Sequence, residues 1–303
     1  MIEILSFCLL CLFIIYCYNL VIFIKFTKYK PSKSTYSVPV SIIICAKNEE
    51  TNLKLNLRHV LQQEYKDFEV IVVNDQSIDG SKYYLESLQN KFDNLVVCNL
   101  DKKINTREGK KFALTIGIKL AKHENLLLID ADCKPNSKKW VEEIVNCFKN
   151  NNIILGYGSY ENTKTILNRF IRYDTYLIAK QYFSFCLFGY PYMGVGRNLA
   201  YTKNVFFENK GFANHMHIAS GDDDLFIQEV AVNNSVGIVV NKNTHTISQS
   251  NKKWRNWIYQ KRRHLTTSRF YDLKFKILLA IYPLSQLFFW LSLFVLFFMN
   301  LEY

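Results

Sequence analysis

The sequence predicts an α/β domain with a mostly parallel sheet, flanked by one transmembrane helix at each end. Both ends of the 303-residue chain carry long apolar runs without a formal charge. The region between them alternates short β-branched runs with segments of helical apolar spacing, as βαβ units do. The mean hydropathy of −0.04 is too low for a chain that crosses a membrane along its whole length. With 15% aromatic residues, the chain is also unlike a disordered one.

Each terminal run is long enough to cross the hydrocarbon core of a bilayer, which is about 30 Å thick. The first run is Ile4–Ile24 and the second is Ile277–Leu301, where Pro283 is tolerable in a membrane helix. A signal peptide is the alternative for the first run, but Glu3 precedes it and no small-residue cleavage pattern follows. A buried core helix is the alternative for the second run. We predict a signal anchor at 1–24 and a membrane helix over the second run.

Basic residues flank the two runs on their inner sides. Lysines are frequent in the linker 25–37, and Arg269, Lys274 and Lys276 precede the second run. The positive-inside rule then predicts a plasma-membrane protein with residues 25–276 in the cytoplasm. This topology explains much of the net charge of +12, so membrane lipids are expected partners and nucleic acid is not. The eight cysteines lack zinc-ligand spacing, which favours free thiols in a reducing cytosol.

The central region, 38–250, is predicted to form the α/β domain. Short apolar runs rich in β-branched residues predict strands at Val40–Cys45, Phe68–Asn74, Leu95–Asn99, Asn125–Asp130 and Ile153–Tyr157. Apolar residues at helical spacing predict helices at Thr51–Gln63, Ser81–Lys91 and Gly109–His123. Strands that alternate with helices indicate a Rossmann-like sheet, whose ligands bind at the carboxyl ends of the strands.

The ends of these predicted strands are acidic. Residues 46–50 (AKNEE) follow the first strand, Asp75 follows the second, and Asp130-Ala131-Asp132 closes the fourth. Two carboxylates at i and i+2 after a buried strand can face one divalent cation, and oxygen ligands suit Mg²⁺ or Mn²⁺. The alternative is an ordinary loop or helix cap. The sequence has neither G-x-G-x-x-G after its first strand nor a P-loop motif, so dinucleotide and P-loop functions are poorly supported.

A second acidic cluster, Gly221-Asp222-Asp223-Asp224, opens a helical segment that runs through Val230. Three adjacent carboxylates repel one another, so we expect a ligand to stabilise some of them or the pKa of some to be raised. Such a group is suited to act as a general base. The alternative is a helix N-terminus with favourable negative charge.

The segment 251–276 is predicted to be amphipathic and to lie at the membrane surface. Trp254, Trp257 and Ile258 share one helical face, and basic residues surround them. Gln260 and Arg263, at i and i+3, can turn inward toward a pyrophosphate.

The order of CAKNEE, VNDQS, DAD, GDDD and Q-K-R-R-H resembles the membrane-bound family 2 inverting glycosyltransferases, which have a GT-A fold. The resemblance covers about Val38 to His264. It implies transfer from a nucleotide-diphosphate sugar, with a UDP-sugar favoured over a GDP-sugar, to a lipid or glycan acceptor. It also implies a divalent metal, Mg²⁺ or Mn²⁺, and a role in cell-surface glycan or polysaccharide synthesis.

Carried over residue by residue, the resemblance implies a role for each motif. The donor-binding residues would be Ala46, Glu49, Asp75, Lys110, Asp130, Gln260 and Arg263. Asp132 would bind the metal. The catalytic base would be Asp222 by the spacing to Asp224-Leu225, or Asp223 by a plain GDD alignment. His264 replaces the tryptophan of the family's Q-x-x-R-W motif, so processive polymer synthesis is not predicted.

The stretch Gln181–Asn198 mixes aromatic residues with glycines and lies between the donor motifs and the base. Glycine permits close backbone approach, so we expect acceptor contacts from Gly194, Gly196, Arg197 and Asn198. Aromatic packing against a membrane-facing helix is the alternative. Two other functions remain open at this point. One is a sugar nucleotidyltransferase, which would require a glycine-rich loop after the first strand. The other is a catalytically inactive membrane scaffold of the same fold.

Overall fold

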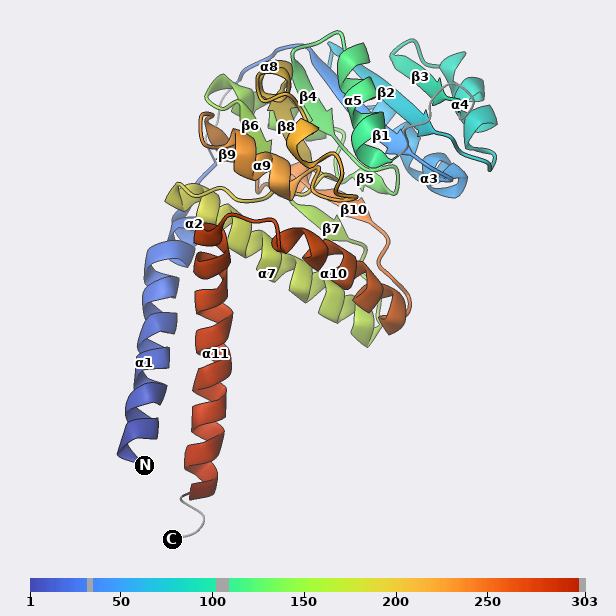
Figure 1. Cartoon of the computed structure of the whole chain (residues 1–303). Helices are drawn as coiled ribbons and strands as arrows, with labels where there is room; N and C mark the ends of the chain where they lie inside the picture. Colours follow the sequence, from blue (N-terminus) through green and yellow to red (C-terminus); the bar gives the residue numbers. More distant parts are fainter. Residues whose placement is uncertain (32–34, 102–108, 300–303) are drawn as a thin grey trace.

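The computed structural model describes residues 1–31, 35–101 and 109–299, and a seven-stranded sheet forms its centre (Figure 1). The strand order is β3-β2-β1-β4-β8-β6-β9. The bounds are β1 Val40–Ala46, β2 Phe68–Asp75, β3 Leu95–Leu100, β4 Asn125–Leu128, β6 Ile153–Leu155, β8 Leu199–Thr202 and β9 Val236–Ile238. Among the strands described for this sheet, β8 alone runs antiparallel to its neighbours, which are β4 and β6. The predicted α/β class with a mostly parallel sheet is therefore confirmed.

Helices cover both faces of this sheet, because alternate side chains of each strand point to opposite sides. Ile42 and Ile44 of β1 share one buried cluster with Leu53 of α3, whereas Ile43 joins the opposite cluster with Leu114 of α5. The helices of the domain are α3 Glu50–Leu61, α4 Ser81–Gln89, α5 Lys110–Leu120, α6 Trp140–Val145, α7 Ile166–Phe188, α8 Lys203–Glu208 and α9 Asp224–Val230. Short 3₁₀ turns lie at Asn146–Lys149, Ala213–His215 and Lys242–Thr244.

A second sheet of three short strands lies below the carboxyl end of β4. Its order is β5-β10-β7, with β5 Cys133–Pro135, β7 Gly158–Tyr160 and β10 Thr246–Ser248. The predicted strand at 153–157 is thus shorter than expected, because the chain leaves the main sheet after Leu155 and enters this small sheet at Gly158. The small sheet fixes Asp132, which directly precedes β5, at the edge of the main sheet.

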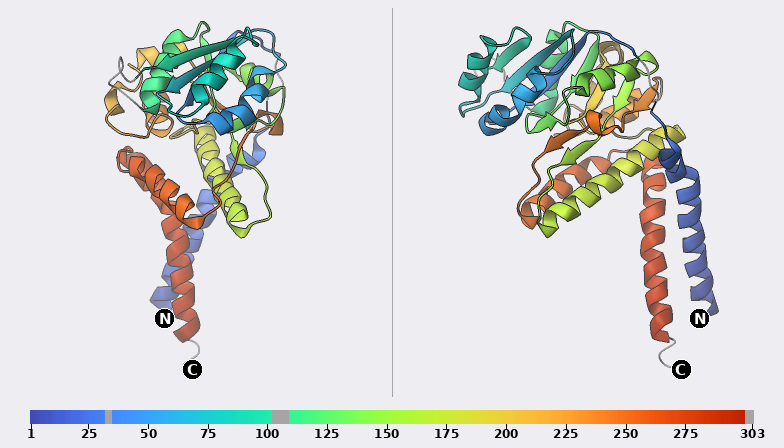
Figure 2. Two further views of the ribbon diagram at one scale, coloured as in Figure 1. Left: turned by 90° about the vertical axis from the view of Figure 1, so that its right-hand side faces the viewer. Right: turned by 180° about the vertical axis from the view of Figure 1, so that it is seen from behind.

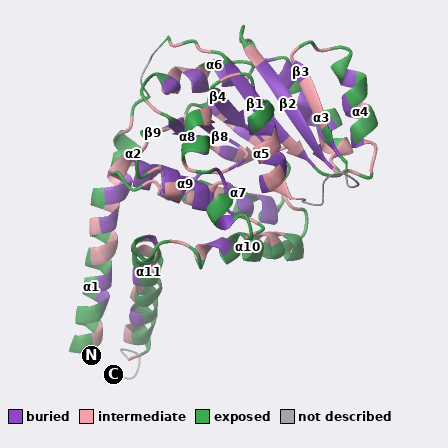
Figure 3. Cartoon of the chain, turned by 45° about the horizontal axis from the view of Figure 1, so that its top comes forward, coloured by how far each residue is buried: buried purple, intermediate pink, exposed green. Residues whose placement is uncertain are grey.

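Two long helices extend away from the domain, and the N-terminus lies at the end of the first one that is far from the domain (Figure 1). The N-terminal one runs through α1 Ile2–Tyr18, a π-helical turn at Asn19–Phe23 and α2 Ile24–Lys28, and the C-terminal one is α11 Leu273–Met299. Both are long and apolar enough to cross a membrane. They pack side by side through aromatic pairs, with ring centroids 5.9 Å apart for Phe7 and Phe288. Their outer surfaces are exposed, in contrast to the buried strands (Figure 3).

Helix α10, Trp254–Ser268, lies beside α7 beneath the domain, oblique to the two long helices (Figure 2). Lys261 of α10 forms an ion pair with Asp174 of α7. Phe170 of α7 packs on Trp257, with ring centroids 5.2 Å apart. Thr267 is the only fully buried residue of α10, so this helix contacts the domain lightly.

Candidate active site

Three acidic and basic side chains from distant segments meet at the carboxyl edge of the sheet. Lys110 is the first residue of α5, Asp130 follows β4, and Asp222 precedes α9. The Lys110 Nζ atom lies 2.9 Å from Asp130 Oδ1 and 2.9 Å from Asp222 Oδ2. Burial alone would lower the pKa of Lys110, but attraction to these carboxylates raises it well above the ordinary value. One ammonium group therefore bridges the two acidic motifs.

Asp222 and Asp223 have different surroundings. Burial opposes ionisation of Asp222, but Lys110 holds the pKa of Asp222 below its ordinary value. Asp223 accepts hydrogen bonds from the backbone amides of Gly196 (3.0 Å) and Asp224 (2.9 Å), and the second bond caps α9. Burial and the neighbouring carboxylates raise the pKa of Asp223 to about 7. The pKa values of the two aspartates are thus shifted in opposite directions, and the raised pKa of Asp223 reflects the repulsion expected within the cluster.

Asp224 connects this loop to the C-terminal helices. Its Oδ2 atom accepts hydrogen bonds from the hydroxyls of Thr267 (2.5 Å) and Tyr271 (2.8 Å). Thr267 is in the last turn of α10, and Tyr271 lies two residues before the start of α11. Sequence reasoning did not find these two partners, because an isolated hydroxyl residue in a helix gives no signal of a distant contact.

The predicted nucleotide-binding residues lie together at the ends of β1 and β2. Ala46 is the last residue of β1, Glu49 directly precedes α3, and Asp75 is the last residue of β2. The Asp75 Oδ2 atom accepts a hydrogen bond from the Gly109 amide at 3.1 Å. Its buried Oδ1 atom has no hydrogen-bond partner among the residues that the structure describes. A buried acceptor without a partner is costly, so this oxygen is available to an N–H donor of a ligand.

Two residues at these strand ends adopt left-handed backbone conformations, Asn48 with φ 57° and Gln76 with φ 55°. The Asn48 side chain accepts a hydrogen bond from the Ile78 amide, and the Asn48 amide donates to Ser77 Oγ, both at 2.8 Å. These bonds join the two loops. Left-handed non-glycine residues are often found at ligand sites, and sequence reasoning did not select Asn48.

Asp132 stands at the surface next to this group, and its side chain is exposed. The Cys133 thiol donates a hydrogen bond to Asp132 Oδ1 at 3.2 Å. Within the described ranges, no group of three or more His, Cys, Asp or Glu side chains is arranged to hold a metal ion. A metal at Asp132 would therefore need ligands from the bound substrate, which is usual for Mg²⁺ at nucleotide phosphates.

The residues expected to contact the acceptor have different surroundings. A Cβ atom on Gly196 would come within 3.0 Å of Lys110 Nζ and 3.3 Å of Asp222 Oδ2, so glycine lets this backbone approach the charged group. Arg197 instead donates to the Gly158 carbonyl at 2.7 Å. Gly194 packs against the Leu199 side chain.

Asn198 is buried and supports the fold. Its amide donates to the carbonyls of Tyr157 (2.9 Å) and Thr244 (2.8 Å) and accepts from the Trp140 indole (3.2 Å). Both amide hydrogens are therefore used within the domain. Gly196 borders the carboxylate cluster. Acceptor contacts by all four residues stay predictions.

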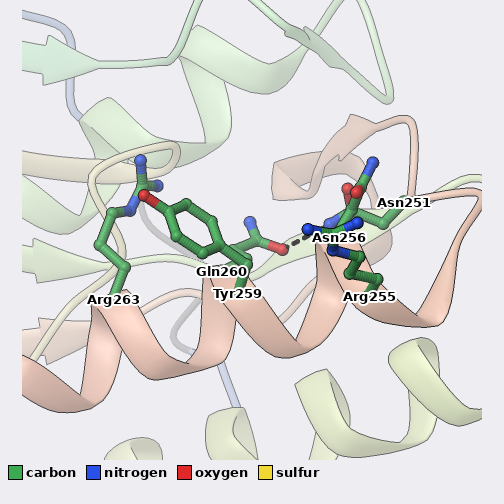
Figure 4. Close-up of a pocket in the computed structure, with 6 residues that line it drawn as sticks. All are labelled: Asn251, Arg255, Asn256, Tyr259, Gln260 and Arg263. Atoms are coloured by element: carbon green, nitrogen blue, oxygen red, sulfur yellow. Dashed lines mark hydrogen bonds between the residues drawn. The ribbon is translucent and has the colours of Figure 1, made fainter.

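Gln260 and Arg263 project from α10 toward the domain (Figure 4). They line a cavity of about 570 Å³ together with Asn251, Arg255, Asn256 and Tyr259. The Asn251 amide donates to Gln260 Oε1 at 2.8 Å. Within residues 1–31, 35–101 and 109–299, no carboxylate forms an ion pair with Arg255 or Arg263. The cavity is therefore lined by amides and two unneutralised guanidinium groups, which suits anions.

The loop before the GDDD cluster is held by a buried lysine. Lys111 Nζ contacts His215 Nδ1 at 2.7 Å and donates to the carbonyls of His215 (2.6 Å) and Ile218 (3.2 Å). Burial and the neighbouring ammonium lower the pKa of His215 from 6.5 to about 4. Glu229 faces the other ring nitrogen, with 3.6 Å between His215 Nε2 and Glu229 Oε2. His215 is therefore neutral at physiological pH.

This histidine predicts a pH dependence of stability. Below pH 6.5 the unfolded chain binds a proton at His215, whereas the folded protein does not until about pH 4. Stability from this group is thus fully present above pH 6.5 and falls between 6.5 and 4, by about 1.4 kcal/mol at pH 5.5. Thermal unfolding of the detergent-purified protein at pH 7.5 and 5.5 measures this. The His215→Gln variant should lose less stability on acidification, and an equal loss in both proteins would contradict the assignment.

The chain resembles known proteins in sequence and in fold. Residues 41–210 match the family model described as Glycosyl transferase family 2. The solved structure of the mannosyltransferase PcManGT from Pyrobaculum calidifontis, in complex with GDP-Man and Mn²⁺, has a TM-score of 0.67 at 16% identity and covers 96% of this chain and 85% of that chain. S. aureus TarS 1–349 in complex with UDP-GlcNAc has a TM-score of 0.53 at 17% identity, covering 71% of this chain and 60% of that chain. The fold and the matches define a glycosyltransferase with a GT-A fold. The chain belongs to glycosyl transferase family 2.

Curated relatives match over shorter stretches. Glycosyltransferase AglE of Haloferax volcanii is 30% identical over 191 residues, which are 60% of this chain and 58% of AglE. The chain spans between 36% and 58% of the length of the first curated relatives it matches. The substrate and the acceptor of this protein are therefore inferred from its own residues.

Proposed function

We propose that this protein transfers a sugar from a nucleotide-diphosphate sugar to an acceptor hydroxyl, with inversion and with the help of a divalent metal, in cell-surface glycan or polysaccharide synthesis. The observation that carries this proposal is the Lys110 bridge between Asp130 and Asp222. This bridge supports the proposal because it holds the donor motif with Asp130 close to the base Asp222. A single displacement requires the two to be within reach of one another.

Asp222 is the base in this proposal. It is tied through Lys110 to Asp130 on the donor side, and the lowered pKa keeps it ionised. Both Asp223 oxygens instead accept backbone amides, so Asp223 positions the loop and caps α9. The spacing to Asp224-Leu225 in the sequence also favours Asp222 as the base. The base takes the proton of the acceptor hydroxyl as that oxygen attacks the anomeric carbon.

Donor binding is assigned to the strand ends and to α10. The free Asp75 oxygen suits an N–H group of the nucleotide base. Asp132 would hold Mg²⁺ or Mn²⁺ against the donor diphosphate, where the ion would neutralise charge on the leaving group. Gln260 and Arg263 reach into the anion-binding cavity and would contact the same diphosphate. One displacement inverts the anomeric carbon, so the chain needs no covalent nucleophile.

We also propose that α1 and α11 span the plasma membrane, with the domain in the cytoplasm. Their apolar character supports this, as do basic flanks on the domain side. Helix α7 adds a further observation, because it exposes an apolar stripe at spacings of four, three and four residues. The stripe consists of Ile166, Phe170, Tyr173 and Leu177, which are 78%, 44%, 60% and 43% exposed. A bilayer surface would cover such a stripe.

Nucleotide binding tests the donor site directly. We expect the detergent-purified protein to bind UDP or GDP more tightly with Mn²⁺ than without it, with a preference for UDP. Calorimetry on the folded protein measures both the effect of Mn²⁺ and the preference for UDP. If well-folded protein binds neither nucleotide, the donor site is wrong and a non-catalytic scaffold of the same fold becomes the better explanation.

A further inference from the structure

The cavity beside α10 has one guanidinium group that the proposed donor site does not use. Arg263 is assigned to the donor diphosphate, whereas Arg255 lines the same cavity two turns earlier (Figure 4). Eight residues of helix separate them by about 12 Å along its axis. Two different phosphate groups can therefore be bound at once, one near each arginine. The amides of Asn251 and Asn256 line the cavity on the Arg255 side.

The faces of α10 show from which side a second phosphate would arrive. At about 100° per residue, Trp254, Ile258 and Leu265 share one face, and they are 47%, 49% and 66% exposed. Arg263 and Gln260 lie on roughly the opposite face. Arg255 falls between these two faces and is itself exposed. It is therefore at the border between the apolar face and the cavity.

Aromatic side chains surround the N-terminal end of this helix. Phe170 packs on Trp254 and Trp257, with ring centroids 5.5 Å and 5.2 Å away. Tryptophan prefers the headgroup level of a bilayer, and Lys252 and Lys253 directly precede the helix. With the apolar face on the bilayer, Arg255 lies at the level of the lipid phosphates and its cavity opens beside them.

We propose that Arg255 binds the phosphate of a membrane lipid that carries a sugar, and that this phosphate-linked glycolipid is the acceptor. The inference rests on the proposed function, because a base is useful only when the nucleophile has a proton to lose. An ionised phosphate oxygen has none, whereas a sugar hydroxyl does. The hydroxyl oxygen bonds to the anomeric carbon of the donor and its proton passes to Asp222. The bond to the nucleoside diphosphate breaks, and that group leaves with the electron pair. The lipid phosphate keeps all its bonds.

Binding of alkyl phosphates to the full chain in maltoside detergent tests this proposal. The probes are dodecyl phosphate and dodecylphosphocholine, which have the same tail but differ in headgroup charge. We expect the wild-type protein to prefer dodecyl phosphate, and Arg255→Gln to weaken its binding about tenfold, as loss of a charge-assisted hydrogen bond does. Arg262→Gln is the matched control, because Arg262 is also exposed but does not line the cavity. It should bind like the wild type.

Several results would overturn the proposal. Equal losses in the Arg255 and Arg262 variants would indicate general attraction of anions to a basic helix. Inorganic phosphate that binds as tightly as dodecyl phosphate would assign the site to a soluble anion. Weaker UDP or GDP binding in Arg255→Gln would assign Arg255 to the donor. Nucleotide binding without any phosphate preference would remove this inference alone, whereas loss of nucleotide binding in the wild type would remove the proposed function with it.

Discussion

Replacing Asp222 with asparagine should lower the rate of sugar transfer by about 10²–10⁴-fold, the usual contribution of a general base. Nucleotide binding should be largely retained, because Lys110 keeps its ion pair with Asp130 at 2.9 Å. Initial rates of nucleoside diphosphate release, measured with saturating donor, report the loss in kcat. Binding of the nucleotide with Mn²⁺ serves as the test of an intact donor site.

Asp223→Asn is the matched comparison for this experiment. Its oxygens accept the amides of Gly196 and Asp224, so the substitution should lower the unfolding temperature and reduce transfer less than Asp222→Asn does. The opposite ranking, with transfer lost in the Asp223 variant and retained in the Asp222 variant at equal stability, would reassign the base to Asp223.

Replacing Asp132 with alanine should remove the Mn²⁺ dependence of nucleotide binding and make transfer undetectable. The described residues include no alternative cluster of metal ligands, so the ion would lose its protein anchor. Without the ion, the charge on the leaving diphosphate is not neutralised. Calorimetric titration of UDP and GDP, with and without Mn²⁺, measures the change.

Glu64→Ala provides the control for Asp132→Ala, because it removes a surface carboxylate of equal charge whose nearest ion-pair partner is Lys138. It should bind nucleotide and metal like the wild-type protein. Metal-dependent binding that survives in Asp132→Ala would show that other groups hold the ion.

The main sheet was predictable where the sequence pattern is local. Strands β1 and β2 are continuous apolar runs because both of their faces are buried, and the helices after them have a single apolar face. Strand β8 was not predicted, because Leu199–Thr202 is short and lacks the alternation of a half-buried strand. It is also antiparallel, so no βαβ pattern indicates it.

The site was predictable as a set of motifs and not as a set of contacts. The acidic strand ends were informative because parallel strands bring their carboxyl ends to one edge. The Lys110–Asp222 pair depends on the path of the chain between β4 and α9, which includes β8 and the strands β5 and β7 of the small sheet. Asn198 was selected for its position near glycines, and no local pattern indicated that its amide supports buried backbone. Its contact with an acceptor stays a prediction.

The contact of Tyr271 with Asp224 has a consequence for biosynthesis. The loop that carries Asp222 is fixed by a residue that the ribosome adds 47 residues after Asp224. By that time α1 has left the ribosome, because it is at the other end of the chain. The loop that carries Asp222 therefore gains this support only after α10 has been synthesised.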